Sequence, residues 1–366
     1  MKERVLYFAV SGLGDNLFAV PALMELEQRY ALSVVCSAGP QSTLFAALLP
    51  QAKIIPLQPG WGSALDVVRQ GFRYDYWLYS IGSSFRRTRL INLLGCAKKR
   101  YAFTSLSTLN AWQLELGFDL CMIPDFGKHA WRNNYQLLTL LDPGYLKLSK
   151  TWDDYAAQAR RRILETKPEK ITKTDSLFIH AGCNKYAGRL ERYKRWPVKH
   201  FLHVADDFMK KGACSRAEFF VGPSEENLLT DYHSWVQDHP NSGPMTLYDQ
   251  SQHRNDLLLI AQRLIQSKVF VGNDSGIAHL AAMLGVPTMV VMSATGQPSH
   301  TRPEGRHSIT IEHPVPCQGC TIGITGQRAL QFECPNEWAC MATILPDQVI
   351  HESKDLLYRI EKRTLC

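Results

Sequence analysis

Short apolar runs alternate with longer stretches of helical periodicity along most of this chain. Runs such as Val5–Val10, Ser176–His180 and Val269–Val271 have the length of buried strands. Between such runs, apolar residues recur at the spacing of an amphipathic helix, as they do in the segment that ends at Tyr30. Strands that alternate with helices predict an α/β fold built on parallel sheets.

This pattern divides into two halves. The length of 366 residues favours two domains. A turn at Asp142-Pro143-Gly144 is followed by a charged helix near Trp152 to Glu165, and Lys167-Pro168-Glu169-Lys170 is typical of a linker. We therefore expect a first domain over residues 1–166, a second domain over 171–345 with a cysteine-rich loop at 313–341, and a C-terminal helix over 346–366.

The segment from Asn273 to Ala282 places several polar groups at one predicted helix start. It lies between two apolar runs, as the crossover of a βαβ unit does. Asp274 and Ser275 can cap the helix, and Gly276 lets the backbone approach a ligand. His279 lies on the same helical face as Ser275. Because a helix N-terminus attracts anions, we expect a phosphorylated sugar to bind here. The simpler alternative is a capped helix with a buried histidine.

A glycine-containing turn from Ser11 to Asn16 follows the first predicted strand. Its glycines allow a tight turn into a helix, and Asp15 lies at the helix start. The third glycine of a dinucleotide-binding fingerprint is missing. A carboxylate at the end of a parallel strand suits a general base, and a helix N-cap is the alternative.

Four segments of the chain together resemble the heptosyltransferases, glycosyltransferase family nine. They are Gly14-Asp15 with Pro21-Ala22-Leu23 behind it, Lys194-Arg195-Trp196-Pro197, Gly222 to Glu226, and Asn273 to Ala282 with Gly285-Val286-Pro287. The resemblance covers most of the chain and implies the GT-B architecture, in which two Rossmann-like domains face each other across a cleft. It implies a C-terminal helix that crosses back to the first domain. It also implies inverting transfer of heptose from ADP-heptose without a catalytic metal.

The resemblance assigns roles to individual residues. Asp15 is the implied general base, and Lys194 is the implied contact to the donor diphosphate. The implied donor-binding residues are Gly182, Cys183, Asn184, Glu225, Asp274, Ser275, Gly276 and His279. Glu225 is expected to bind the ribose of ADP, with stabilisation of a helix dipole as the alternative. Gly182 and Cys183 stand where the family often has hydroxyl residues, so backbone N–H groups are expected to contact the diphosphate there. The expected acceptor-binding residues are Gly14, Ser83, Arg86 and Arg87.

Four of the ten cysteines cluster near the end of the chain, at Cys317, Cys320, Cys334 and Cys340. The pair Gln318-Gly319 makes a tight knuckle, and four thiolates at this spacing can enclose one tetrahedral ion. The branch of the family that glycosylates autotransporter proteins is similar in having an iron-binding finger. We expect structural iron or zinc here, and four reduced, packed cysteines are the alternative.

Composition limits the class of protein. A content of 45% hydrophobic and 20% charged residues predicts a globular protein, and no apolar run reaches membrane-spanning length. We expect a cytoplasmic protein with peripheral contact to the inner membrane. The net charge of +7 comes partly from basic clusters at 86–100, 160–162 and 185–195. The cluster at 160–162 reads as a solvated face. No nucleic-acid motif is present, so we expect no nucleic-acid partner. The sequence does not decide whether the chain forms a homo-oligomer.

Three functions compete on this basis. The favoured one is transfer of heptose from ADP-heptose to the inner core of lipopolysaccharide. The first alternative keeps the chemistry but changes the acceptor to serine or threonine hydroxyls of an autotransporter protein. The second alternative is a non-catalytic ADP-sugar-binding or assembly protein, against which Asp15 and Lys194 argue.

Overall fold

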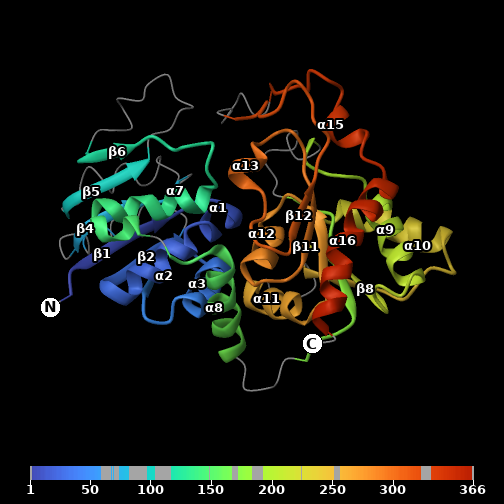
Figure 1. The fold of residues 1–366 in the computed structure, drawn as a ribbon, viewed down its shortest axis with the longest axis horizontal. Helices are drawn as coiled ribbons and strands as arrows, with labels where there is room; N and C mark the ends of the chain where they lie inside the picture. Colours follow the sequence, from blue (N-terminus) through green and yellow to red (C-terminus); the bar gives the residue numbers. More distant parts are fainter. Residues whose placement is uncertain are drawn as a thin grey trace. The chain divides into compact units, whose positions relative to one another are not determined.

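The chain folds into two compact units, Met1–Thr151 and Trp152–Cys366, each built on one parallel sheet (Figure 1). The computed structural model describes residues 2–58, 67, 69, 74–81, 97–103, 117–147, 149–166, 172–183, 193–223, 225–250, 256–322 and 331–364. The predicted α/β fold with parallel sheets is confirmed for both units. In the described residues, no helix is both long and apolar enough to cross a membrane.

The sheet of the first unit has the strand order β3-β2-β1-β4-β5-β6. Its strands are β1 (Arg4–Ala9), β2 (Ala31–Ser37), β3 (Lys53–Leu57), β4 (Tyr74–Tyr79), β5 (Ala97–Phe103) and β6 (Leu120–Met122). Its described helices are α1 (Leu13–Leu17), α2 (Val20–Arg29), α3 (Pro40–Leu48), α7 (Ala130–Gln136) and the 3₁₀ turns Leu137–Leu140 and Pro143–Leu146. Strand β1 pairs in parallel with β2 on one side and β4 on the other. The end of β1 is therefore a switch point, where ligands of α/β sheets bind.

The sheet of the second unit has the order β12-β11-β10-β7-β8-β9. Its strands are β7 (Ser176–His180), β8 (Arg216–Val221), β9 (Met245–Asp249), β10 (Val269–Asn273), β11 (Thr288–Val291) and β12 (Ser308–Ile311). Its described helices are α8 (Trp152–Glu165), α9 (Val198–Lys210), α10 (Asn227–Asp238), α11 (Leu257–Gln266), α12 (Gly276–Met283), α13 (Pro298–Thr301), α15 (Ala339–Ala342) and α16 (Pro346–Thr364). The switch point lies between β7 and β10.

Helix α8 belongs to the second unit, although the sequence placed the domain boundary after it. The indole Nε1 of Trp152 donates to the Ala282 carbonyl in α12, at 3.4 Å. The Arg160 guanidinium donates to the carbonyls of Leu284 and Ile265, at 3.5 and 3.4 Å. These carbonyls lie at the C-terminal ends of α12 and α11, where a positive charge is favourable. Arg160 is thus a packing contact rather than part of a solvated basic face, and the boundary falls at residue 151.

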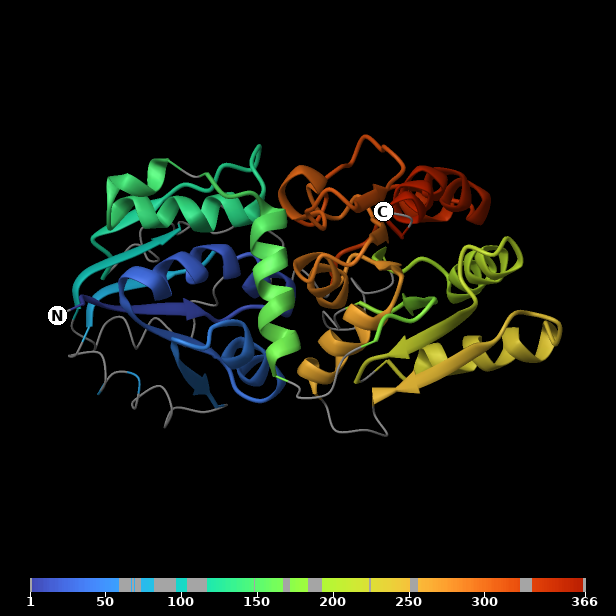
Figure 2. The same cartoon turned by 60° about the horizontal axis from the view of Figure 1, so that its bottom comes forward.

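The C-terminal helix α16 also packs within the second unit. It lies beside α9 (Figure 2), and it contacts β12. Its side chains Val349, Ile350 and Leu356 are buried in the same core as Trp196. The Trp196 indole donates to the Ile344 carbonyl just before the helix, at 2.9 Å. These contacts place α16 in the core of the second unit.

Gly272 occupies a place in β10 where no side chain fits. A Cβ there would lie 2.6 Å from the backbone oxygen of His180 and 2.8 Å from the Phe270 ring. We predict that Gly272→Ala lowers the free energy of unfolding by about 1–3 kcal/mol, as overpacking does. Urea denaturation measures this change. The control Gly296→Ala, whose Cβ would meet nothing closer than 3.4 Å, should have a much smaller effect. Equal stability of the two variants would contradict the prediction.

Candidate functional site

The turn between β10 and α12 carries the main polar cluster of the second unit. Ser275 is the N-cap of α12, and its Oγ accepts from the Ala278 N–H at 3.3 Å. Gly276 begins the helix, so its N–H belongs to the free first turn. The predicted strand, turn and helix are all present. A ligand anion at this point would meet the positive end of the helix dipole.

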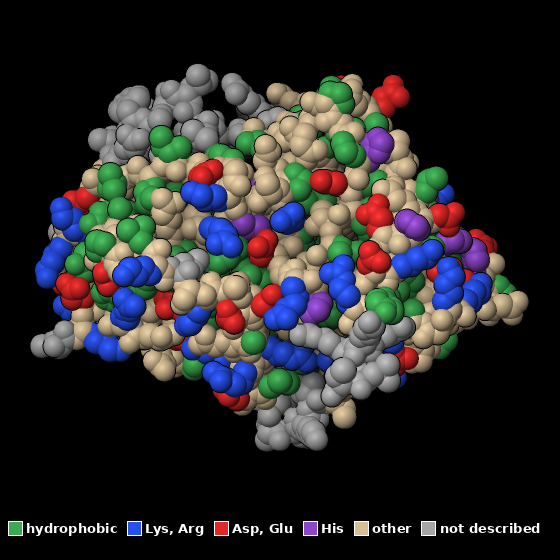
Figure 3. All heavy atoms as spheres, viewed as in Figure 1, with side chains coloured by type: hydrophobic (Ala, Val, Ile, Leu, Met, Phe, Trp, Pro, Cys, Tyr) green, Lys and Arg blue, Asp and Glu red, His purple; other side chains and the backbone are tan. Residues whose placement is uncertain are grey.

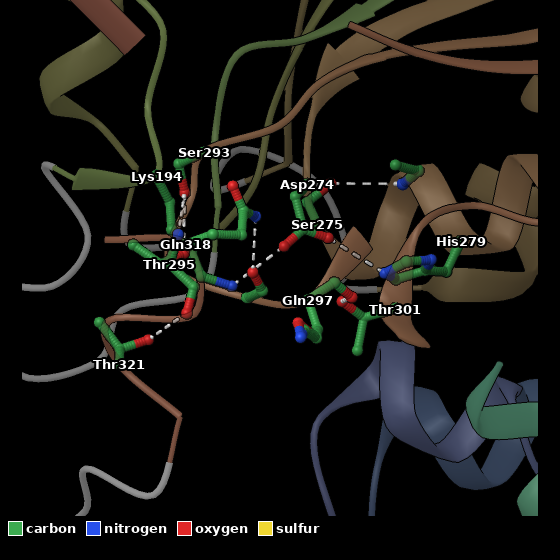
Figure 4. A network of polar contacts seen from close by, with 12 residues as sticks. Lys194, Asp274, Ser275, His279, Ser293, Thr295, Gln297, Thr301, Gln318 and Thr321 are labelled. Atoms are coloured by element: carbon green, nitrogen blue, oxygen red, sulfur yellow. Dashed lines mark hydrogen bonds and ion pairs between the residues drawn. The ribbon is translucent and has the colours of Figure 1, made fainter. Parts of the chain in front are cut away.

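Asp274 is a buried carboxylate between the Lys194 ammonium group and the His279 imidazole. Its Oδ2 lies 3.1 Å from Lys194 Nζ, and its Oδ1 lies 3.2 Å from His279 Nε2 (Figure 4). Burial by itself would raise the pKa of Asp274, but Lys194 and His279 outweigh it and hold that pKa well below its usual range. Asp274 is therefore ionised. The Lys194 side chain is 37% exposed, so its ammonium group is accessible to a ligand.

Asn273 holds the Lys194 segment against the end of β10. Its Nδ2 donates to the Ala181 carbonyl at 2.6 Å, and its Oδ1 accepts from the Trp196 N–H at 2.9 Å. The side chain is completely buried. The Asn273 side-chain amide thus connects two segments, the one after β7 and the one before α9, to the end of β10, next to Asp274. Asn273 was assigned no role from the sequence, although a polar residue at the end of an apolar strand is a usable signal.

Glu225 lies in a buried network rather than on an open surface. Its Oε2 accepts from the Gly222 N–H at 2.9 Å and lies 3.0 Å from His180 Nε2, while its Oε1 lies 3.7 Å from Arg195 Nη2. Burial opposes ionisation, yet His180, the Gly222 N–H and Arg195 together lower the pKa of Glu225. Gly182 leaves room for this carboxylate, because a Cβ at that position would collide with both carboxylate oxygens.

His180 was not among the residues selected from the sequence. It ends β7, and its Nδ1 lies 3.1 Å from Ser275 Oγ. It therefore connects Glu225 with the start of α12. The neighbouring Cys183 is buried, and burial raises the pKa of its thiol to about 11, so it is neutral at physiological pH. Asn184, the other expected donor contact in this segment, lies outside the described residues.

In the first unit, Asp15 lies in α1 directly after the central strand. The N-cap of α1 is Gly12, which makes no side-chain cap, so Asp15 is not the cap of this helix. Ser11 Oγ donates to Asp15 Oδ2 at 2.6 Å. The adjacent Asn16 is buried, and its Nδ2 donates to the Ser11 carbonyl at 3.0 Å and to Gln41 Oε1 at 2.8 Å. The turn is thus fixed by side-chain hydrogen bonds.

Four further residues are expected to contact the acceptor. Gly14 lies in the first turn of α1, next to Asp15. Ser83, Arg86 and Arg87 lie outside the described residues.

On the face drawn in Figure 3, Lys and Arg side chains are interspersed with Asp and Glu side chains. Several of the basic residues are paired, such as Lys98 with Asp75 at 2.7 Å and Lys210 with Asp206 at 2.6 Å. Much of the clusters at 86–100 and 185–195 lies outside the described residues.

The cysteine-rich loop is attached to the segment that follows β11. The Gly319 N–H donates to the Ala294 carbonyl at 2.7 Å, and Thr321 Oγ1 donates to the Thr295 carbonyl at 2.8 Å. Figure 4 shows Gln318 and Thr321 in one network with Ser293 and Thr295. The knuckle of this loop is therefore held at the carboxyl end of the second sheet.

The four clustered cysteines are free thiols in the structure. Burial raises the pKa of the Cys320 thiol to about 11, and the thiols of Cys317, Cys334 and Cys340 add to that rise. Asn336 Nδ2 donates to Cys317 Sγ at 3.0 Å, and the Trp338 N–H donates to Cys334 Sγ at 3.2 Å. Among the described residues, no group of three or more His, Cys, Asp or Glu side chains is arranged to hold a metal ion.

Each of the two α/β units has polar side chains at a switch point of its parallel sheet, which is where open α/β sheets bind ligands. The sequence profile described as Glycosyltransferase family 9 (heptosyltransferase) matches residues 125–322, more than half of the chain. The protein therefore belongs to glycosyltransferase family 9, which confirms the family expected from the sequence.

Proteins similar to this chain carry names from the same family. The "Lipooligosaccharide heptosyltransferase 2" of Haemophilus ducreyi (strain 35000HP / ATCC 700724) is 22% identical over 97% of this chain and 99% of its own length. A glycosyl transferase family 9 structure from Veillonella parvula DSM 2008 has a TM-score of 0.70 at 17% identity and covers 98% of each chain. The E. coli ADP-heptose lps heptosyltransferase II has a TM-score of 0.67 at 14% identity, over 98% of this chain and 99% of that one. The two structures support the fold.

The lowered pKa of Asp274 makes its contribution to stability depend on pH. A carboxyl whose pKa is depressed in the folded state stabilises the protein above its unfolded pKa of about 4, and this contribution is lost as the pH falls below that value. We predict that Asp274→Asn lowers the free energy of unfolding by roughly 2 kcal/mol at pH 7, through loss of charge-assisted contacts. The difference from wild type should shrink as the pH falls below about 4. Urea denaturation across this range tests it, and a difference that is independent of pH would contradict it.

Proposed function

We propose that this glycosyltransferase moves heptose from ADP-heptose to the inner core of lipopolysaccharide, with inversion at the anomeric carbon. The observation that carries the proposal is the cluster of Asp274, Lys194 and His279 at the start of α12. It combines an accessible ammonium group with the positive end of a helix, which suits a diphosphate. The heptosyltransferase names of similar proteins support heptose as the sugar and lipopolysaccharide as the acceptor.

The donor half of the mechanism uses the second unit. Lys194 and the N–H groups at the start of α12 hold the diphosphate, and they offset the charge that develops on ADP as it leaves. Asp274 keeps Lys194 in place and, with His279, contacts the donor sugar. The backbone at Gly182 and Cys183 lies at the end of the neighbouring strand β7, and Asn184 is assigned to the donor with them. Glu225 is assigned to the ribose, through the oxygen that faces Arg195.

The acceptor half of the mechanism uses Asp15. This carboxylate removes the proton from the attacking hydroxyl of the acceptor as that oxygen bonds to the anomeric carbon. The bond from that carbon to the diphosphate oxygen breaks at the same time, which inverts the configuration. No metal takes part in this displacement. The support is the place of Asp15 at the switch point of the first sheet and its hydrogen bond from Ser11. Gly14, Ser83, Arg86 and Arg87 are the assigned acceptor contacts, and an acceptor in the membrane would bring the enzyme to its cytoplasmic face.

The competing acceptor is a protein hydroxyl, and the cluster of four cysteines favours it because the autotransporter-modifying branch resembles this chain there. Release of ADP from ADP-heptose, measured with purified lipopolysaccharide that lacks core heptose and with an autotransporter fragment, separates the two. The proposal predicts turnover with the lipid only. Turnover with the protein only would show that the acceptor is a protein hydroxyl instead of the lipid. No turnover with either acceptor would favour a non-catalytic ADP-sugar-binding protein.

Asp15→Asn tests the general base. The amide keeps the shape and the hydrogen bond from Ser11 but cannot take a proton at neutral pH. We predict a fall in kcat of about two to four orders of magnitude, with donor binding nearly unchanged. Asp119→Asn, an exposed carboxylate of the same unit, is the control and should retain full activity. Turnover like that of the wild type in the Asp15 variant would give this residue a structural role instead.

We further infer that Cys317, Cys320, Cys334 and Cys340 hold one structural zinc or iron ion. The thiols of Cys317, Cys334 and Cys340 contribute to the raised pKa of Cys320, and the N–H groups that donate to Cys317 and Cys334 stabilise thiolates as they do around bound metals. Four cysteine ligands would leave no position open for substrate, so the ion would stabilise the loop only.

This assignment predicts about one metal ion per chain in tag-free protein, measured by elemental analysis. Iron would add visible absorption, whereas zinc would be colourless. Cys334→Ser should lower both the metal content and the melting temperature, because loss of a ligand is loss of folding energy. Cys121→Ser, outside the cluster, should change neither. Metal at background level, with four freely titratable thiols, would show that the loop is held by packing alone.

A further inference from the structure

A buried chain of hydrogen bonds runs from Glu225 through His180 to Ser275. Glu225 Oε2 lies 3.0 Å from His180 Nε2, and His180 Nδ1 lies 3.1 Å from Ser275 Oγ. All three side chains are at least nine-tenths buried. The chain therefore links the ionised acid after β8 to the residue that caps α12, and the mechanism so far leaves His180 without a task.

The partners of this chain decide where its protons lie. An ionised carboxylate only accepts hydrogen bonds, so His180 Nε2 must carry a proton and donate it to Glu225. When His180 carries a proton on Nε2 only, Nδ1 accepts, and the Ser275 hydroxyl is then the donor across the 3.1 Å between Oγ and Nδ1. Ser275 Oγ also accepts from the Ala278 N–H. In that state the Ser275 hydroxyl donates its only proton to His180, so it has no proton to donate to a ligand.

We propose that binding of the donor diphosphate is coupled to the uptake of one proton by His180. A proton from the buffer adds to Nδ1, so that Nδ1–H donates to Ser275 Oγ. The Ser275 hydroxyl then no longer donates to His180, and it donates to a diphosphate oxygen instead. No covalent bond other than N–H forms, and the proton returns to solvent when ADP leaves. The proposal rests on the ADP-sugar donor assigned above, and it makes His180 a positioning residue for that donor.

The charges around His180 favour this exchange. Glu225 supplies a carboxylate at Nε2, and Arg195 partly offsets it from the segment before α9. From β8 the Phe220 ring packs against the imidazole at 5.1 Å, and from the end of β7 the Cys183 thiol is neutral. At the start of α12, the charge of Asp274 is already paired with Lys194 and His279. A diphosphate at Ser275 would therefore add negative charge beside Nδ1, which stabilises an imidazolium.

Calorimetric titration of ADP-heptose in buffers that differ in ionisation enthalpy measures the coupled proton. The diphosphate diester of this donor does not itself titrate near neutral pH. At pH ~8, where an ordinary histidine is neutral, the wild type should take up close to one proton per donor bound. Because binding takes up a proton, Kd should rise as the pH rises, by up to about tenfold per pH unit. Binding without proton uptake would overturn the coupling while leaving the donor assignment intact, and no binding at all would overturn both.

Variants assign the proton to His180. His180→Gln keeps an amide between the same partners but cannot be protonated, so proton uptake should vanish and Kd should rise about ten- to hundredfold. The control His351→Gln changes an exposed histidine on α16 and should behave as wild type. Uptake that persists in His180→Gln would assign the proton elsewhere, for example to His279, and would overturn the proposal.

A double-mutant cycle with Ser275→Ala tests the link itself. Loss of the Ser275 hydroxyl alone should weaken donor binding to a similar degree, and the double variant should bind no worse than the weaker single one. Additive losses would mean that the two side chains act independently, which would overturn the relay. Ser275→Thr keeps the hydroxyl and should restore both the affinity and the proton uptake. His180→Asn replaces His180→Gln if circular dichroism shows that the latter is unfolded.

Discussion

The polar cluster at the start of α12 depends on a buried negative charge, the carboxylate of Asp274. An isolated ion in the interior costs several kcal/mol, so it must be paired. Lys194 and His279 supply the pairing, and each comes from a different segment. The segment that carries Lys194 is in turn held by the completely buried side chain of Asn273. In the proposed donor site, an anion would meet both the ammonium group of Lys194 and the start of α12.

Much of this arrangement follows from local sequence. A strand, a turn with Asp, Ser and Gly, and a helix could be predicted for residues 269–283, because apolar periodicity and capping residues act over a few positions. The same reasoning placed Asp15 after the first strand. The order of strands could not be predicted in this way, since β1 pairs with β2 and β4 through contacts distant in the sequence. The family resemblance supplied what periodicity alone could not.

Other features depend on contacts that no local pattern encodes. The charged helix α8 reads as the end of the first half, yet Arg160 places it on the carbonyl ends of α11 and α12. Glu225 reads as an open ligand contact, yet His180, 45 positions earlier in the chain, lies against it. Gly182 provides the space for that carboxylate, a reason for glycine that only the folded structure reveals. The paired acids and bases of the site are therefore a property of the assembled sheet.

The most direct test of the account is a crystal structure of the protein with ADP bound. We predict that diphosphate oxygens lie within hydrogen-bond distance of Lys194 Nζ and of the Gly276 N–H, with the Asp274 carboxylate still between Lys194 and His279. A diphosphate bound elsewhere, with Lys194 and the start of α12 free of it, would contradict the central claim that this strand end is the donor site.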